Sequence, residues 1–482
     1  MFLTLLILIP IVGIVTIMLL PELTNKILIR KLGLIFSLSV LWLSVFIWGS
    51  FEGDGREVQY ISDVFNNEYY PIKLSLDGLS IYFVLLTTFI FPIALLSNWE
   101  NLDDKKVSIK YYVILMLLIE FLLLLVFTVS DILLFYIFFE SILPPLFVLI
   151  GMYGSTRKIQ ASFYIFLYTF LGSIFMLLSF TTIYWVTGIR DIQLLKDISL
   201  DVNLQKILWI GIFFALAVKT PLVPLHLWLP LAHAESPLGG SVILAGIVLK
   251  LSLYGILRIL IPILPEASLY YTPLVYLICV ITIIYSSLTT LRQSDLKVII
   301  AYSSIGHMAI CTLGAFSNTL DGIEGSILLA IAHGLVSPAL FVSVGGILYD
   351  RTHTRALSYY RGLLSYMPIF SIMFFIFSLC NIAVPFSANF VGEFLIFSGA
   401  FQRMPVLTVL ASISIVLSAG YGIWLYIRLI GGSYSPYLGV LPDMTRREIY
   451  LMLPLLFLTI VLGINPNIVL DIVHGSITSM LY

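Results

Sequence analysis

Seven titratable side chains lie inside long apolar stretches of this sequence: Glu120, Glu140, Lys219, Lys250, His307, His333 and Glu393. A charge at the centre of a bilayer costs at least about 2.5–3.5 kcal/mol on insertion scales, so each group should face protein or water and have a partner. One buried ion pair could simply hold two helices together. Seven groups spread over seven segments instead favour proton relay, because carboxylate, amine and imidazole can each hold or release a proton.

Proline residues lie close to three of these charges. A proline removes one backbone hydrogen bond and breaks or kinks a helix. Broken helices inside a membrane persist only where they line a cavity or are buried in protein, and they mark ion sites in transporters. A kink that only serves packing could explain one such coincidence, but it explains three of them poorly. The predicted breaks lie at Pro144 and Pro145 after Glu140, at Pro221 and Pro224 after Lys219, and at Pro385 before Glu393.

The composition identifies the solvent of these segments as lipid. Of the 482 residues 60% are hydrophobic and only 11% are charged, whereas a soluble chain carries roughly 25% charged residues. The net charge of -1 leaves no basic surface for nucleic acid. We therefore predict an all-α, multi-pass membrane protein that binds no nucleic acid.

Apolar runs of spanning length predict about 14 transmembrane helices. No segment between them is long and polar enough to be a soluble domain. We expect residues 1–20 to be the first helix rather than a signal or transit peptide. The predicted spans are 1–20, 30–49, 76–98, 110–128, 131–153, 160–187, 205–229, 238–261, 272–290, 297–316, 322–348, 366–400, 406–431 and 449–471.

The loop cations predict the orientation. One set of loops carries Lys26, Arg30, Lys31, Lys105, Lys106, Lys110, Arg157, Lys158, Arg292, Lys297, Arg351, Arg355, Arg361, Arg428, Arg446 and Arg447. The opposite loops carry only Arg56, Lys73, Arg190, Lys196, Lys206, Arg258 and Arg403. Because positive loops stay on the cytoplasmic or matrix side, both termini are expected on the other side.

Metal and disulfide chemistry have little support in the sequence. Cys279, Cys311 and Cys380 are far apart and lie in apolar runs, which is typical of small buried side chains. His226 and His233 lie near the end of the seventh predicted helix and in the loop after it, as proton uptake points or as interfacial residues. Their spacing does not suit a tight metal site, and the neighbouring Glu235 does not change this.

Two features hint at an internal repeat of about five helices. The helix that breaks after Lys219 has a counterpart five segments later in the helix of Pro385 and Glu393. The Ser-Pro pair that follows His333 echoes the Ser-Pro pair that follows His233. Repeats of this kind are common in transporters.

Several long motifs closely resemble the antiporter-like membrane subunits of respiratory complex I. The similarity covers nearly the whole chain. The motifs are Phe-Tyr-Ile-Phe-Phe-Glu at 135–140, His-Leu-Trp-Leu-Pro-Leu-Ala-His-Ala-Glu-Ser-Pro at 226–237, the run 291–308, Ile-Ala-His-Gly at 331–334, Tyr-Asp-Arg-Thr-His-Thr-Arg at 349–355 and Asn-Phe-Val-Gly-Glu-Phe at 389–394.

The resemblance implies two inverted five-helix repeats in which the seventh and twelfth helices are broken. Helices 1–3 would occupy 1–109, the first antiporter-like half 110–261, the second half 262–431, and the fourteenth helix 432–482. The implied hydrophilic axis is Glu140, Lys219, Lys250, His307, His333 and Glu393. In this family the glutamate of the fifth helix pairs with the lysine of the seventh. Members of one type carry glutamate at position 393, where others tend to carry lysine. Glu120 is outside the family pattern and its role stays open.

The implied function is proton translocation coupled to NADH:ubiquinone electron transfer, as a subunit of the H⁺-translocating NADH:ubiquinone reductase. Flavin, iron–sulfur clusters and quinone would belong to partner subunits, with bound lipids but no redox centre or metal in this chain. Expected partners are membrane-arm subunits, including two further antiporter-like ones. The expected location is the mitochondrial inner membrane, with both termini in the intermembrane space; a bacterial plasma membrane is the alternative. A subunit of a multisubunit cation/proton antiporter and a non-conducting scaffold are the competing functions.

Overall fold

The computed structural model describes the chain except for residues 1, 22–24, 52–57, 66–71, 100–107 and 482. Thirteen of the described helices are long and apolar enough to cross a membrane. The twelfth expected span is not among them, because it is divided into two shorter helices, Pro368–Asn381 and Ala388–Arg403. The prediction of a helical membrane protein is therefore confirmed, with the twelfth crossing broken as expected.

The chain forms two compact units. Unit 1 comprises Met1–Thr220, Ile247–Pro273 and Asp471–Tyr482, and unit 2 comprises Pro221–Gly246 and Leu274–Leu470. The first boundary follows Lys219 by one residue. The candidate relay residues divide between the units as Glu140, Lys219 and Lys250 in unit 1, and His307, His333 and Glu393 in unit 2. The four-part division made from the sequence stays a prediction.

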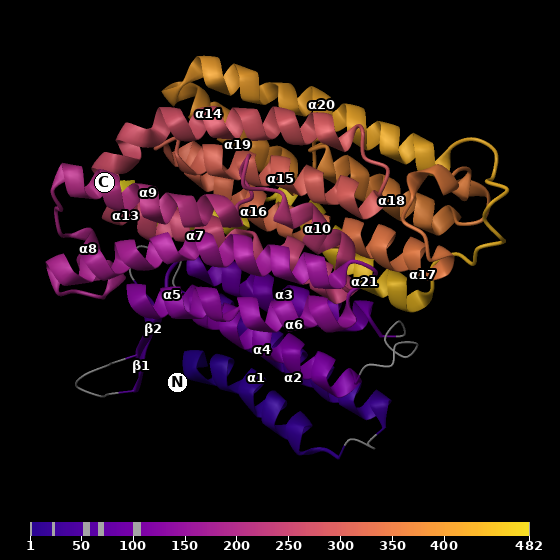
Figure 1. Ribbon diagram of the computed structural model, residues 1–482, viewed down its shortest axis with the longest axis horizontal. Helices are drawn as coiled ribbons and strands as arrows, with labels where there is room; N and C mark the ends of the chain where they lie inside the picture. Colours follow the sequence, from indigo (N-terminus) through magenta and orange to yellow (C-terminus); the bar gives the residue numbers. More distant parts are fainter. Residues whose placement is uncertain (1, 22–24, 52–57, 66–71, 100–107, 482) are drawn as a thin grey trace. The chain divides into compact units, whose positions relative to one another are not determined.

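Unit 1 begins with helices α1 and α2, which pack against each other and against α4 (Figure 1). A short antiparallel hairpin of β1 and β2 precedes α3, a departure from an all-helical chain. The elements are α1 Phe2–Leu19, α2 Lys26–Gly49, β1 Gln59–Phe65, β2 Ile72–Leu76, α3 Ser80–Ser97, α4 Ile109–Thr128, α5 Ile132–Ser141, α6 Leu143–Tyr153, α7 Lys158–Thr187, α8 Ile192–Lys196, α9 Val202–Lys219, α12 Lys250–Gly255, η2 Ile256–Leu260 and α13 Ile261–Ile263.

Unit 2 is built around α15, α16 and α19, which pack against one another (Figure 1). Three elements, η1 Leu244–Val248, α14 Pro265–Thr290 and α22 Asn467–Leu481, continue from one unit into the other. The remaining elements are α10 Trp228–Glu235, α11 Leu238–Ile243, α15 Leu296–Ala315, α16 Leu320–Phe341, η3 Val342–Leu348, α17 Tyr349–Thr352, η4 Leu357–Tyr359, η5 Leu363–Ser365, α18 Pro368–Asn381, α19 Ala388–Arg403, α20 Pro405–Ile430 and α21 Arg446–Ile464.

Five of the six helices that carry candidate relay residues start at side-chain caps; α12, which carries Lys250, does not. A polar side chain before the first turn accepts a hydrogen bond from one of the backbone N–H groups that lack a partner within the helix. Such a cap fixes where the helix begins and hence the depth of each side chain along it. The caps are Asp131 for α5, Asp201 for α9, Asp295 for α15, Thr319 for α16 and Ser387 for α19.

The seventh span is broken after Lys219, where α9 ends, as predicted. Two other expectations were wrong. His233 lies in helix α10 rather than in a loop. The fourteenth span ends at Ile464, and a separate helix, α22, follows from Asn467. The apolar run of the fourteenth span continues past Pro466, so hydropathy alone did not show where that helix stops.

A buried arginine holds the loop before α3. Arg258, which the sequence placed among the loop cations, is buried in η2 and forms an ion pair with Asp77. Asp77 and Ser80 also exchange hydrogen bonds, at 2.9 Å from the Ser80 N–H to the carboxylate and 2.8 Å from the Asp77 N–H to the hydroxyl. Burial would raise the pKa of Asp77, but Arg258, Ser80 and Lys196 together lower it.

We expect Asp77→Asn to destabilise the protein by about 3–5 kcal/mol, because it leaves the buried Arg258 charge without its partner. The lowered pKa means that ionised Asp77 contributes stability above its ordinary pKa of 3.8, and that this contribution is lost as pH falls through the lower folded value. Asp77→Asn should therefore lower the midpoint temperature of thermal inactivation by the same amount at every pH from about 8 to 5. Asp201→Asn is the control, because it removes the charge of an exposed cap residue while asparagine can still cap α9. Equal midpoints for both variants would contradict this role.

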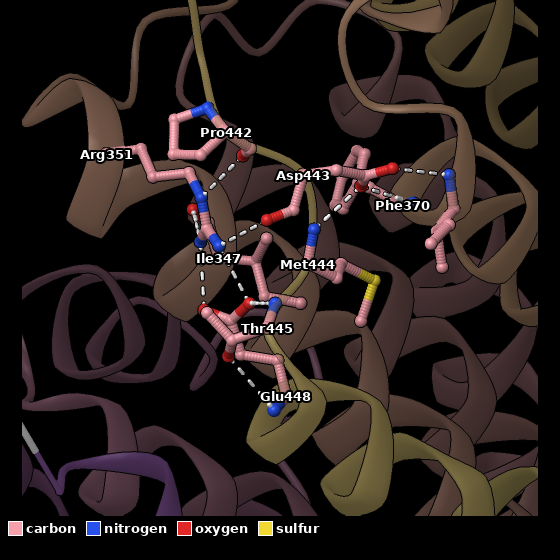
Figure 2. Close-up of polar contacts among 9 residues, drawn as sticks. Ile347, Arg351, Phe370, Pro442, Asp443, Met444, Thr445 and Glu448 are labelled. Carbon is pink, nitrogen blue, oxygen red and sulfur yellow. Dashed lines mark hydrogen bonds and ion pairs between the residues drawn. The ribbon is translucent and has the colours of Figure 1, made fainter.

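The segment after α20 is fixed by Arg351 (Figure 2). Its guanidinium donates to both carboxylate oxygens of Glu448, at 2.9 and 2.7 Å, and to the carbonyls of Ile347, Pro442 and Asp443. Asp443 in turn accepts the N–H groups of Ile369 and Phe370 at the start of α18. Arg351 therefore joins α17, α18 and α21 within unit 2.

Candidate proton-relay site

Lys219 is the last residue of α9 and is buried at 2% exposure. Its ammonium donates to the carbonyl of Phe139 at 3.0 Å and lies 3.3 Å from the centre of the Phe139 ring. The negative end of the α9 dipole and the electron-rich ring face both favour a cation there. A buried amine thus meets the helix break between α5 and α6.

Glu140 follows Phe139 directly, at the end of α5. Both carboxylate oxygens are shielded from solvent and accept no hydrogen bond that meets normal geometry within the described part of the chain. The charges of Glu140 and Lys219 nevertheless interact. The two groups are therefore neighbours without a closed ion pair, and the ammonium is held by the Phe139 carbonyl instead. Such an arrangement leaves room for the contact to form and open.

Lys250 lies fully buried at the first residue of α12. A π-helical turn, η1, precedes it and a second, η2, follows at Ile256. Turns with this wider hydrogen-bond spacing are rare and frequently occur at functional sites, because they turn side chains out of the regular helical register. The eighth expected span is thus not a plain α-helix, and its irregular turns flank the lysine.

His307, Glu393 and His333 are the three candidate relay residues of unit 2. His307 Nδ1 lies 3.1 Å from a carboxylate oxygen of Glu393, and both side chains are buried. The rings of His307 and His333 have centroids 5.5 Å apart. Imidazole and carboxylate at hydrogen-bond distance can exchange a proton directly. Three of the predicted relay residues therefore lie together, from helices α15, α16 and α19.

The helix break before Glu393 is backbone-strained. Between α18 and α19, the non-glycine residues Ala383 and Phe386 have positive φ angles of 62° and 73°. Such conformations cost about 1–3 kcal/mol each and persist where the surroundings impose them. Here α21 contributes, because the position of a Cβ on Gly463 lies 2.2 Å from the carbonyl oxygen of Phe386. Pro385 therefore lies in a constrained connection rather than in a simple kink.

Comparison with known proteins supports the same interpretation. The family described as "NADH:quinone oxidoreductase/Mrp antiporter, TM" matches residues 129–418. NADH-ubiquinone oxidoreductase chain 4 of Mycosarcoma maydis is 53% identical, over 100% of this chain and 99% of that protein. Its counterpart from Arabidopsis thaliana is 46% identical, over 98% and 96%. This chain belongs to the NADH-ubiquinone oxidoreductase chain 4 family.

Solved structures show the same fold. A chain of respiratory complex I from Thermus thermophilus with bound NADH superposes with a TM-score of 0.88 at 27% identity, covering 100% of this chain and 99% of that one. A chain of the Mrp complex from Dietzia sp. DQ12-45-1b also gives 0.88, but at 20% identity, over 99% and 97%. The second likeness concerns the fold alone.

The remaining titratable groups named from the sequence lie apart from these contacts. Glu120 is fully buried in α4, and its carboxylate oxygens lack hydrogen-bond partners among the described residues. His226 lies against the rings of Tyr285 and Tyr302, with centroids 5.4 and 6.0 Å away. His233 stacks on Phe341 at 4.7 Å. All three side chains are buried.

A second charged cluster was not predicted from the sequence. Lys297, expected in a loop, is buried, and its amine donates to the carbonyl of Ser236 at 3.2 Å. Beside it, Arg355 pairs with Glu235 at 3.2 Å and with Asp295 at 3.7 Å. Burial raises the pKa of Asp295, although Arg355 and the N–H groups at the start of α15 oppose that rise. Asp295, a cap residue two positions before Lys297, was the available signal that a helix starts there.

Close packing of α16 against α19 sets the position of Glu393. A Cβ on Gly392 would lie 2.8 Å from the backbone N and 2.9 Å from the Cα of Leu329. We expect Gly392→Ala to push the helices apart, at a cost of about 1–3 kcal/mol, and to reduce NADH-driven proton translocation. Gly420→Ala is the control, since nothing lies within 4 Å of its added methyl. Wild-type thermal stability of Gly392→Ala complexes would show that the two backbones are not held together here.

Proposed function

We propose that this chain is a proton-translocating membrane-arm subunit of respiratory complex I, coupled to NADH:ubiquinone electron transfer in partner subunits. The contact of His307 with Glu393 inside the membrane-spanning part carries the proposal, together with membership of the chain 4 family. The enzyme to which the chain contributes is NADH:ubiquinone reductase. The protein is a multi-pass inner-membrane protein, in keeping with its apolar helices.

The chain's own residues would hold and pass protons at defined atoms. Lys219 holds a proton on its amine at the α5 break, and its release depends on the nearby Glu140 carboxylate. Lys250 continues the relay from between its two π-helical turns. In unit 2, His333 and His307 pass the proton to a carboxylate oxygen of Glu393, the terminal site of this subunit.

The redox groups are proposed to belong to partner subunits. Flavin, iron–sulfur clusters and quinone would be bound there, and among the described residues no group of three or more His, Cys, Asp or Glu could hold a metal. The proposed partners are the other membrane-arm subunits, two of them antiporter-like, with lipids bound at the apolar surface. We also propose the mitochondrial inner membrane as the location, with both termini on the intermembrane-space side.

A cation/proton antiporter subunit is the second candidate, because the chain from the Dietzia Mrp complex has the same fold. Affinity purification of a tagged chain from native membranes separates the two. Complex I membership predicts a large assembly that contains flavin and iron–sulfur subunits and oxidises NADH. Recovery only in an assembly without those groups would favour the antiporter and contradict the proposed function.

The proposed orientation is tested by cysteine labelling in sealed mitochondrial inner-membrane vesicles. The three native cysteines are buried, so labelling of a single introduced cysteine shows on which side of the membrane that position lies. Ser358→Cys, beside Arg355 and Arg361, should react only with reagent on the matrix side. Ser199→Cys, in the segment between α8 and α9, is the matched position for the other side. Labelling of Ser358→Cys from the intermembrane-space face would overturn the topology.

A further inference from the structure

A polar pocket lies in unit 1, where α5 begins and α7 ends. Its volume is about 280 Å³, roughly twenty times what a single ordered water needs, so it has room for a group of several non-hydrogen atoms. The relay proposed above does not use this pocket. All of its lining residues belong to unit 1, and its polar and charged side chains are Lys73, Ser130, Asp131, Tyr184, Arg190 and Asp191.

The pocket lies at the depth where lipid headgroups are found. Asp131 directly precedes the spanning segment of α5 and α6, and Gly188 directly follows the spanning helix α7. Trp185, in the last turn of α7, is 86% exposed. Exposed tryptophan at the end of a spanning helix is typical of the boundary between lipid tails and water. A phospholipid beside α7 therefore presents its headgroup at the level of the pocket.

Two aspartates lie side by side in the pocket lining. Backbone hydrogen bonds of 3.0 and 2.8 Å on either side pair Asp131 with Asp191 in antiparallel fashion. In such a pair the two side chains lie on one face, with Cβ atoms about 4.5–5.5 Å apart. Each carboxylate accepts the N–H groups of its own helix start through one oxygen, Oδ1. Because like charges placed directly opposite are destabilising, a cationic group that bonds the second oxygen of each is favoured here.

Two cations line the same pocket. Arg190 is held by Tyr184, whose ring centre lies 4.5 Å from the guanidinium carbon and whose hydroxyl accepts a hydrogen bond from it at 2.9 Å. Lys73, in β2, is exposed, and its backbone carbonyl accepts the N–H and the hydroxyl of Ser130. Guanidinium and ammonium groups are the usual protein partners of phosphate. The lining therefore carries two positive and two negative side chains, which suits a ligand that itself carries both charges.

We propose that this pocket binds the headgroup of a phosphatidylethanolamine. The phosphate contacts Lys73 and Arg190, and the primary ammonium donates to Asp131 and Asp191. A primary ammonium has three N–H donors, enough for both carboxylates, whereas the quaternary ammonium of phosphatidylcholine has none. Phosphatidylglycerol, which has no amine, would leave the two carboxylates without a cation between them. The inference concerns lipid binding alone and holds whether or not the proton relay is correct.

Photolabelling of the purified, delipidated complex in phosphatidylcholine nanodiscs tests the site. A trace of phosphatidylethanolamine with a diazirine near its headgroup should label residues 184–191, as located by peptide mass spectrometry. Unlabelled phosphatidylethanolamine should suppress this labelling at about tenfold lower concentration than phosphatidylglycerol, since a hydrogen bond to a charged group contributes about that factor in affinity. Equal competition by phosphatidylglycerol would overturn the headgroup assignment. Equal competition by soluble glycerophosphoethanolamine would show that the ligand is not a lipid.

Two substitutions test the two halves of the pocket separately. Asp191→Asn removes a carboxylate, while the amide can still accept the Gln193 N–H at the start of α8. It should weaken competition by phosphatidylethanolamine about tenfold and abolish the preference over phosphatidylglycerol, whereas Asp201→Asn, at the cap of α9, should not. Lys73→Gln should weaken competition by both phospholipids, and Lys206→Gln, a cation outside the pocket lining, should not. Wild-type labelling and lipid preference in assembled Asp191→Asn and Lys73→Gln complexes would overturn the site.

Discussion

Lys219→Ala is expected to reduce NADH:ubiquinone turnover of the assembled complex by about a hundredfold, the lower end of what a positioned proton-transfer group contributes. The amine links the end of α9 to the carbonyl and ring of Phe139, and the Lys219 side chain is buried. Its loss removes a proton carrier and leaves Glu140 without the nearby cation. Turnover per assembled complex, quantified on native gels, measures the effect.

Glu140→Gln should have a comparable effect, because it leaves the Lys219 charge without the carboxylate that favours it. If the two residues act as one unit, the double variant should be little worse than either single variant. Lys206→Ala is the control on the same helix, since its amine lies over the Tyr270 ring, 4.0 Å from the ring centre, near the start of α9. Losses that simply add would show that Glu140 and Lys219 work independently.

Glu393→Gln is expected to reduce turnover at least about tenfold while the complex still assembles. The amide keeps the shape of the side chain but cannot take up or release a proton at the contact with His307 Nδ1, which lies 3.1 Å from the Glu393 carboxylate. His307→Ala should give a loss of similar size, since it removes the other half of the contact. Glu266→Gln, at an exposed position in the first turn of α14, should behave as wild type. Normal turnover of the Glu393→Gln complex would contradict a proton-transfer role for Glu393 and leave it a packing role only.

The membrane-spanning character and the broken helices were predictable from the sequence. Apolar length showed the spans, and proline beside a buried charge showed the breaks after Lys219 and before Glu393. The contact of His307 with Glu393 is consistent with the predicted axis, although sequence spacing alone could not place two residues that are 86 positions apart at hydrogen-bond distance. Whether each residue relays protons stays a prediction.

Several features of the structure cannot be predicted from hydropathy. Lys297 and Arg258 looked like loop cations, because a charge at the edge of an apolar run has the same pattern whether it faces water or a buried carboxylate. The π-helical turns around Lys250 are equally hidden, since an apolar stretch buried on all sides has no periodicity to be disturbed. The hydrogen bond from the Lys219 amine to the Phe139 carbonyl was not predicted, because a backbone acceptor cannot be read from side-chain types.

Proton translocation per NADH oxidised, measured in liposomes that contain the purified complex, tests the central claim most directly. Wild-type and Lys219→Ala complexes would be compared at equal NADH oxidation rates, with Lys206→Ala as the control. The relay predicts that Lys219→Ala moves fewer protons per NADH, or none, while Lys206→Ala keeps the wild-type ratio. An unchanged ratio in Lys219→Ala complexes at unchanged turnover would contradict a proton path through this chain.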